Sequence, residues 1–205
     1  MRPLPTQTQP TSDPGQWDEQ ALVEACRAQL PHDTSAFTEL LRRHEPSVYS
    51  VCYRYLGNRA DAEELSQDVF LQVFHHFGQF QGRSAFSTWL YTIVRHACLR
   101  RLSRIQRRLA VEAEAGAQAG PATTNPEARL VAVDHVNAVL GRLDPDDREV
   151  IVLRHLAGLS IAEVAEILGI GLSAAKMRLS RAIEAFKASY ARLSEPRPAP
   201  FHRPS

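Results

Sequence analysis

The stretch DPDDREVIVLRHLAGLSIAEVAEILGIGLSAAKMRLSRAIEAFKASY, residues 144–190, decides the fold of the C-terminal part of the chain. Asp144, with proline directly after it, is a helix start, because a side-chain acceptor stands at the cap and proline suits the first helical position. Ser160 followed three residues later by Glu163 is a capping box that opens a second helix, which Gly169 ends. Apolar residues recur at helical spacing throughout. The stretch therefore predicts three helices broken at two glycine-containing turns.

The third predicted helix is basic on the face opposite its apolar stripe. Two helices joined at a tight glycine turn, with the second one basic, are typical of a helix-turn-helix whose second helix enters the major groove. The two leading helices carry more acidic than basic side chains, so positive charge stands where phosphates would lie. A plain three-helix bundle with a solvated basic face is the alternative. The basic residues are Lys176, Arg178, Arg181 and Lys187.

Composition limits what the chain can be. Its 205 residues suffice for one or two domains, and its net charge of +1 means that nucleic acid would have to meet local basic patches. No apolar run approaches a membrane span, and the N-terminus lacks the apolar core of a signal peptide, which predicts a cytoplasmic protein. The cysteines are far apart and lie in helical apolar patterns, which predicts buried free thiols. They are Cys26, Cys52 and Cys98.

Two small helical domains joined by a flexible linker, an all-α fold, are the predicted architecture. Segments rich in proline, or in alanine, glycine and threonine, separate and flank two regions of helical periodicity. Pro46 is expected to break or kink a helix of the first region. The predicted divisions are a disordered tail at 1–16, an N-terminal domain at 17–108, a flexible linker at 109–125, a C-terminal domain at 126–193 and a second disordered tail at 194–205.

The first domain contains two features that could bind a partner. A regular helix is expected over 60–77, and its polar side is acidic, although such faces are usually only solvated. A glycine-containing loop then leads into a helix whose far end is basic. Exposed aromatic rings beside arginines suit single-stranded nucleic acid, because bases stack on rings while arginines follow the backbone. Aromatics beside a helix start are more often core residues, which favours a structural role for Phe86 and Trp89.

Three segments resemble the extracytoplasmic-function (ECF) group of bacterial RNA polymerase sigma factors. DAEELSQDVF at 61–70 is similar to the family's polymerase-binding helix, and FQGRSAFSTWLY at 80–91 to its promoter-melting segment. The segment 143–182 is similar to its −35-reading domain. The resemblance covers roughly 18–103 and 125–188, with all three motifs in the family's order.

The resemblance implies a non-enzymatic subunit, without cofactor or metal, that recruits core RNA polymerase, recognises −35 and −10 promoter elements and promotes strand opening. Its implied partners are core RNA polymerase, double-stranded promoter DNA and the melted −10 strand, with an anti-sigma factor as a further candidate. It would be cytoplasmic and associated with the nucleoid during transcription. The implied core-binding residues are Asp61, Glu64, Gln67 and Asp68. The implied −10 contacts are Phe80, Arg83, Ser84, Phe86, Arg95, His96, Arg100 and Arg101. The implied −35 contacts are Lys176, Met177, Arg178, Ser180 and Arg181.

The chain departs from the family pattern at three places. His96 stands where the family usually has asparagine, and its different donors and acceptors should change the favoured base there. Arg100 stands where an acid is frequent. Ala174 and Ala175 replace a Thr-Val pair, which removes a hydroxyl that could contact a phosphate. These departures concern the promoter sequence rather than the fold.

Two other classes of function compete with this interpretation. A conventional helix-turn-helix regulator with an N-terminal sensing or dimerising domain would need neither the acidic 61–70 face nor the 80–89 loop. An enzyme acting on nucleic acid is disfavoured, because no His, Cys or Asp cluster has the spacing of a metal site or a triad. His75 and His76 are adjacent on a helix, so they point to different sides and could not chelate together.

Overall fold

The computed structural model describes residues 13–114 and 135–194. Every regular element within these ranges is a helix, so the predicted all-α fold is confirmed there. The N-terminal elements are η1 (Pro14–Gln16), α1 (Glu19–Gln29), α2 (Ser35–Leu56), α3 (Arg59–His76), η2 (Phe77–Gln79) and α4 (Phe86–Glu114). The C-terminal elements are α5 (His135–Leu140), α6 (Pro145–His155), α7 (Ile161–Leu168) and α8 (Leu172–Ser194).

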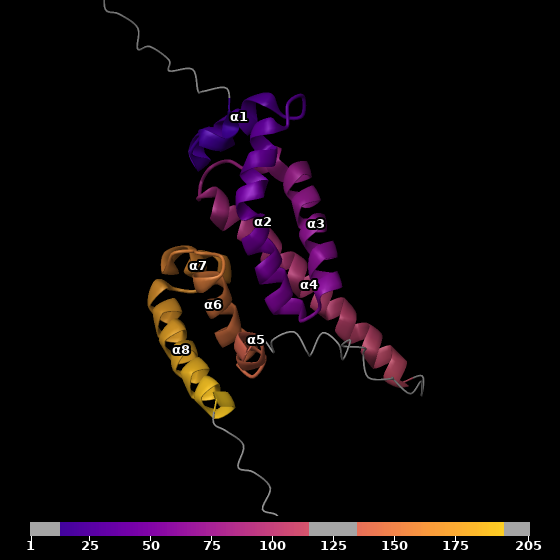
Figure 1. The fold of residues 1–205 in the computed structure, drawn as a ribbon, viewed down its shortest axis with the longest axis vertical. Helices are drawn as coiled ribbons and strands as arrows, with labels where there is room; N and C mark the ends of the chain where they lie inside the picture. Colours follow the sequence, from indigo (N-terminus) through magenta and orange to yellow (C-terminus); the bar gives the residue numbers. More distant parts are fainter. Residues whose placement is uncertain (1–12, 115–134, 195–205) are drawn as a thin grey trace, which may run out of the picture.

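The N-terminal domain is a bundle in which α2 packs against both α3 and α4, while α1 covers one end of α2 (Figure 1). Its core is aliphatic along the length of the bundle, where Leu40, Val69 and Leu90 are completely buried. Burial of each such side chain stabilises the fold by roughly 1.5–3 kcal/mol. Gly57 ends α2 with a φ of +70°, a conformation that costs glycine little, and Asn58 then caps α3.

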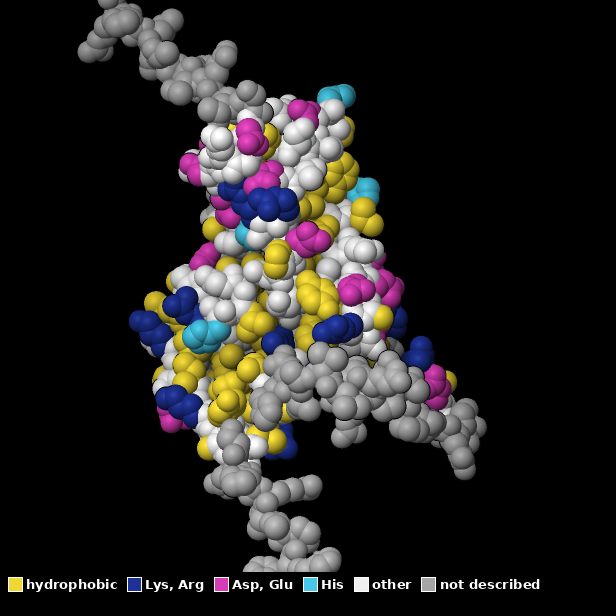
Figure 2. Space-filling view, viewed as in Figure 1, with side chains coloured by type: hydrophobic (Ala, Val, Ile, Leu, Met, Phe, Trp, Pro, Cys, Tyr) yellow, Lys and Arg dark blue, Asp and Glu magenta, His cyan; other side chains and the backbone are white. Residues whose placement is uncertain are grey.

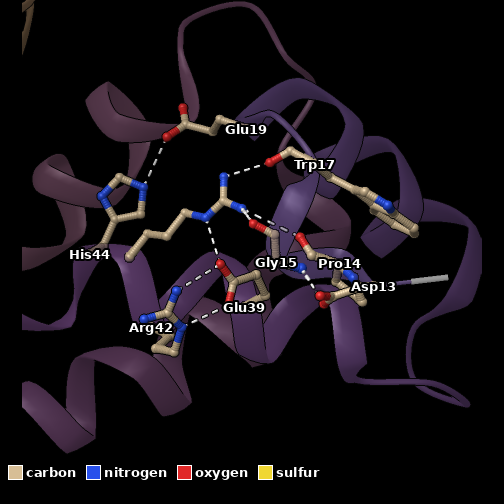
Figure 3. A network of polar contacts seen from close by, with 9 residues as sticks. Asp13, Pro14, Gly15, Trp17, Glu19, Glu39, Arg42 and His44 are labelled. Atoms are coloured by element: carbon tan, nitrogen blue, oxygen red, sulfur yellow. Dashed lines mark hydrogen bonds and ion pairs between the residues drawn. The ribbon is translucent and has the colours of Figure 1, made fainter. Parts of the chain in front are cut away.

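The N-terminal domain begins earlier than the predicted tail boundary at residue 16. Asp13 caps η1 by accepting a hydrogen bond from the amide of Gly15 at 2.9 Å. Arg43 of α2 holds this segment in place: its Nη1 donates to the carbonyl of Trp17 at 2.7 Å and its Nη2 to that of Gly15 at 3.0 Å (Figure 3). Glu39 fixes the Arg43 side chain by accepting from Nε at 2.7 Å. Residues 13–16 are therefore ordered against α2.

Two other sequence expectations need correction. The break that was one of the two outcomes expected at Pro46 does not occur, because α2 runs from Ser35 to Leu56 with Pro46 inside it. The flexible linker was expected to start at residue 109, yet α4 stays helical to Glu114, because leucine, alanine and glutamate, which supply five of the six residues at 109–114, favour helix. The helix expected from residue 126 lies largely outside the described residues, which resume at His135 with α5.

The C-terminal domain has the predicted helix-turn-helix, formed by α7 and α8. Ser160 accepts from the amide of Glu163 at 3.2 Å, and the Glu163 carboxylate accepts from the amide of Ser160 at 2.8 Å, which completes the capping box. Gly169 ends α7 with a φ of +66°. Ala175 and Ala182 of α8 are buried against the rest of the domain, and these small side chains let α8 approach closely.

The two domains touch each other. In Figure 1, α6 and α7 lie beside α2 and α4, and polar contacts join the two pairs. No helix within residues 13–114 and 135–194 has the length and apolar content needed to cross a bilayer.

Candidate functional site

The acidic face of α3 is exposed. Gln67 and Asp68 are open to solvent, and 60% of the Glu64 side chain is accessible. Leu71, one turn further along, has 59% of its surface exposed, the largest apolar exposure on this helix. An apolar side chain ringed by polar ones is the arrangement of a protein interface. Leu71 was not among the predicted docking residues, although a leucine outside the helix's apolar stripe was a visible signal.

Arg101 does not stand free beside this face. Its guanidinium contacts the carboxylates of both Asp61 and Glu64, and its side chain is only 17% exposed. The implied polymerase-binding and −10-binding residues are thus joined directly at this point. Arg100, its neighbour on α4, is exposed and donates to the Gln72 side chain at 3.1 Å.

The loop between η2 and α4 is built on buried aromatic rings. Phe80 is 7% exposed and Phe86 is 3% exposed, and their ring centroids lie 5.8 Å apart at an edge-to-face angle. Trp89 joins them, 5.1 Å from Phe80 and 5.9 Å from Phe86. Both phenylalanines were implied −10 contacts, yet in this conformation neither ring is available to stack on a base. The favoured structural interpretation of Phe86 and Trp89 agrees with this burial.

Arg27 of α1 braces the same loop. Its Nη2 donates to the carbonyl of Phe80 at 2.9 Å, and its guanidinium carbon lies 5.3 Å from the centroid of the Phe80 ring. Gly82 sits against this guanidinium with a φ of +70°. Arg83 is exposed at the loop surface, and Ser84 beside it is half-buried. The contact of Arg27 with the loop was not predicted, because 53 residues separate Arg27 from Phe80.

Along α4 the implied −10 contacts divide into exposed and engaged residues. His96 is exposed, as is Arg100. Arg95 is engaged with the C-terminal domain: its Nε lies 2.9 Å from Oε1 of Glu149 on α6. The hydroxyl of Tyr55 also donates to Glu149, and burial, followed by the charge and the hydrogen bond of that carboxylate, raises the pKa of Tyr55.

Glu163 makes a second contact between the domains. Its Oε1 accepts from Oγ1 of Thr88 at 3.0 Å and from Oγ of Ser87 at 3.2 Å, while the carboxylate also completes the capping box with Ser160. Partial burial alone would raise the pKa of Glu163. The hydrogen bonds from Ser160, Thr88 and Ser87 together outweigh that effect, so the pKa lies below its ordinary value.

The recognition face of α8 is open. Figure 2 shows Lys and Arg side chains on the surface where α8 lies. Met177 has 74% of its surface exposed, and Lys176 and Ser180 are exposed with it. The two arginines of this face are paired with the start of α6: Nη1 of Arg178 lies 3.1 Å from Asp146, and Nη2 of Arg181 lies 2.7 Å from Asp147. These pairs orient both guanidinium groups.

The three cysteines are free and buried, as predicted. Burial raises the pKa of Cys26 to about 11. The sulfur atoms of Cys52 and Cys98 lie 4.0 Å apart in the core between α2 and α4. Among residues 13–114 and 135–194, no three His, Cys, Asp or Glu side chains are grouped so that they could hold a metal ion.

Comparison with known families matches both domains. The model of Sigma-70 region 2 matches residues 40–108, and that of Sigma-70 region 4 matches residues 136–186. The ECF RNA polymerase sigma-E factor of Escherichia coli (strain K12) is 32% identical over 181 residues, which cover 83% of this chain and 93% of that protein. The chain belongs to the ECF sigma factors. SigW of Bacillus subtilis, another ECF sigma factor, is 29% identical over 166 residues, covering 76% of this chain and 89% of SigW.

Solved structures agree with this family. CnrH, solved in complex with the cytosolic domain of CnrY, superposes with a TM-score of 0.65 at 26% identity, covering 86% of this chain and 99% of CnrH. This ECF sigma factor therefore binds core RNA polymerase, recognises −35 and −10 promoter elements and promotes strand opening in transcription initiation. The alternative of a conventional helix-turn-helix regulator does not account for the region 2 match.

Proposed function

We propose that this sigma factor uses three separate surfaces to bind core RNA polymerase, the −10 element and the −35 element. The α3 face around Gln67, Asp68 and Leu71 binds core RNA polymerase. The exposed residues of α4 and of its preceding loop hold the −10 element, and α8 reads the −35 element. The observation that carries the proposal is the open face of α8, where Met177 is 74% exposed while Ala182 on the opposite side is buried.

Within the −10 surface we assign different roles to different residues. Arg83, His96 and Arg100 are exposed and can contact DNA without rearrangement. Phe80 and Phe86 support the loop from within rather than stacking on bases, because their rings are buried. Opening the duplex requires a surface that holds the separated strand and needs no reacting group. The protein therefore acts by binding alone. We place its action in the cytoplasm, on the nucleoid.

We include an anti-sigma factor among the proposed partners. The sigma factor RpoE of Bartonella quintana shares the fold of this chain and is solved in complex with the anti-sigma factor NepR. An anti-sigma factor bound to the exposed α3 or α8 face would compete there with core RNA polymerase or with promoter DNA. Co-purification of the tagged full chain without core polymerase would show whether such a partner accompanies it.

The proposal is tested by co-purification with core RNA polymerase followed by run-off transcription on a promoter library. The expected result is a stable complex and transcripts that share −35 and −10 sequences. A variant carrying Lys176→Ala and Met177→Ala should keep core binding and lose transcripts. A variant carrying Gln67→Ala and Leu71→Ser should lose the complex itself. If the parent chain neither binds core polymerase nor supports transcription, the proposal is wrong.

A further inference from the structure

Two of the three buried cysteines face each other inside the N-terminal domain. Cys52 on α2 and Cys98 on α4 are completely buried, and their sulfur atoms lie 4.0 Å apart. The thiol of Cys98 donates a hydrogen bond to the sulfur of Cys52. The sulfurs are therefore in contact between two helices, although 46 residues separate them in the chain. The function proposed above uses neither thiol.

The two thiols differ in how readily each loses its proton. The hydrogen bond from Cys98, helped by one from Ser66, lowers the pKa of Cys52 in spite of its burial. The same hydrogen bond, together with burial, raises the pKa of Cys98. The thiolate is the form of cysteine that attacks oxidants and disulfides. Cys52 is therefore the nucleophile of the pair, and Cys98 is the thiol that can complete a disulfide with it.

A cavity brings small molecules near the pair. It has a volume of about 160 Å³ and is lined by Tyr55, Arg95 and Leu99, among other residues. Leu99 directly follows Cys98, and Tyr55 stands three residues after Cys52 on α2. A water molecule needs only about 10–15 Å³ of such volume, so the cavity admits hydrogen peroxide, a molecule of similar size. Local opening of the contact between α2 and α4 then exposes the sulfurs, because native proteins open locally without unfolding.

We infer that Cys52 and Cys98 form an oxidation site, at which hydrogen peroxide converts the two thiols into one disulfide. The Cys52 thiolate attacks one oxygen of the peroxide, the O–O bond breaks, and Cys52 becomes a sulfenic acid. The hydroxide that leaves takes up the proton that Cys52 lost. The sulfur of Cys98 then attacks the sulfenic sulfur, the S–O bond breaks, and the oxygen leaves as water with the Cys98 proton. Two thiols and one peroxide thus give one disulfide and two waters, and two electrons pass from sulfur to oxygen.

Formation of this disulfide changes the position of α4. A disulfide holds its sulfurs about 2.05 Å apart, so the two sulfurs must approach each other by about 2 Å. Because protein interiors are close-packed, the helices carry part of this movement. His96 and Arg100 stand two residues to either side of Cys98, on the exposed face of α4. Oxidation therefore displaces the surface that holds the −10 element and spares α8, a consequence that rests on the proposed function.

The first experiment detects the disulfide in the full-length chain. The chain is reduced, freed of reductant, treated with hydrogen peroxide at neutral pH and alkylated with N-ethylmaleimide in denaturant. Of its three cysteines, only Cys26 should carry a maleimide. Non-reduced peptides should contain Cys52 joined to Cys98. If both of these cysteines are alkylated after peroxide treatment, or if either is linked to Cys26 or to a second chain instead, the inference is wrong.

Serine variants test the separate roles of the two thiols. Cys98→Ser keeps a hydrogen-bond donor beside Cys52 but cannot form the disulfide, so a sulfenic acid should accumulate on Cys52 and react with dimedone. Cys52→Ser should leave Cys98 unmodified. A dimedone adduct on Cys98 and none on Cys52 would overturn the assignment of Cys52 as the attacking thiol. Circular dichroism checks that both variants are folded, and the parent chain alone decides whether the disulfide forms. Cys26→Ala is the matched control, and it should form the disulfide as the parent does.

The last experiment measures the effect of oxidation on transcription. The oxidised chain is freed of peroxide, assembled with core RNA polymerase and compared with the reduced chain in run-off transcription from a duplex promoter. It should give fewer transcripts, and dithiothreitol should restore them, whereas a Cys52→Ala chain should transcribe equally after either treatment. Equal transcription by the reduced parent and by a parent whose disulfide has been shown by mass would overturn the displacement of the α4 surface. Absence of transcripts from the reduced parent would instead count against the proposed function.

Discussion

Arg101 of α4 bridges two carboxylates of α3: its Nη2 lies 2.6 Å from Oδ1 of Asp61 and 2.6 Å from Oε2 of Glu64. Hydrogen bonds to Glu64 and then to Asp61 raise the pKa of Arg101, so the guanidinium stays charged at any pH at which the protein is folded. A residue that the family resemblance implied for −10 DNA is therefore committed to the contact between α3 and α4, while Arg100 beside it remains exposed.

Arg101→Ala should have a larger effect on the stability of the fold than on the affinity for promoter DNA. Because the two carboxylates are partly exposed, we expect the free energy of unfolding to fall by about 1 kcal/mol, measured by urea denaturation. Arg100→Ala is the matched control, and it should leave stability within about 0.5 kcal/mol of the parent while reducing affinity for promoter DNA. The reverse pattern, with Arg101→Ala stable and deficient in DNA binding, would make Arg101 a DNA contact.

Leu71→Ser should weaken binding to core RNA polymerase. A well-placed apolar residue at the centre of an interface contributes more than about 1 kcal/mol, so the dissociation constant should rise roughly fivefold or more. Gln67→Ala combined with Glu64→Ala should act in the same direction. Fluorescence anisotropy with labelled sigma factor measures the constant, and Glu63→Ala, at the margin of the exposed side of α3, is the control. Unchanged affinity in Leu71→Ser would remove this residue from the docking face.

Arg181→Lys should show whether Arg181 recognises a base edge or contributes only its positive charge. Arg181 is held against Asp147, whose carboxylate is largely buried, and a lysine keeps the positive charge there but loses the two-pronged donor geometry. If Arg181 reads a base edge, discrimination among −35 sequences should drop by about 1–3 kcal/mol while binding to random duplex stays close to the parent's. Competition titrations over a set of −35 variants measure this. An equal loss on all sequences would mark Arg181 as a phosphate contact.

Gly82→Ala should impair promoter opening and spare the other contacts. A Cβ at Gly82 would lie 2.9 Å from Nη2 of Arg27, and the φ of +70° is strained for alanine, so the loop would lose its brace. Arg27→Ala should have a similar effect, because it removes the hydrogen bond to the Phe80 carbonyl. Permanganate reactivity of thymines on duplex promoter measures opening, and a template with a pre-melted −10 bubble should restore much of the transcription.

Gly78→Ala is the control for this loop. Among the described residues, a Cβ there meets no atom within 4 Å, and Gly78 does not have a positive φ. Core binding and −35 affinity should remain at parental levels in all three variants. If Gly78→Ala and Gly82→Ala open the promoter equally well, the brace that Arg27 forms on the loop has no part in opening.

Much of the helix-turn-helix could be predicted from sequence because its signals act within one turn of helix. Ser160 and Glu163 are three residues apart, and their capping box forms as expected. Gly169 ends α7 in the left-handed conformation that glycine tolerates. The boundaries that failed, at residue 16 and residue 109, depend on other causes. The segment before Trp17 is ordered by Arg43 from α2, a contact that no local pattern encodes.

The sequence by itself determined the helices, their caps and the order of the two domains, since periodicity and capping are properties of neighbouring residues. Only the tertiary structure decided which side chains of these helices are exposed and which are held in contacts. Phe80 and Phe86 are buried because the loop folds onto Trp89, whereas their positions in the chain suit either burial or stacking. Glu163 caps its own helix and also meets Thr88, 75 residues away. A contact across that separation depends on how the two domains pack against each other, so it cannot be predicted from the spacing of residues in the sequence.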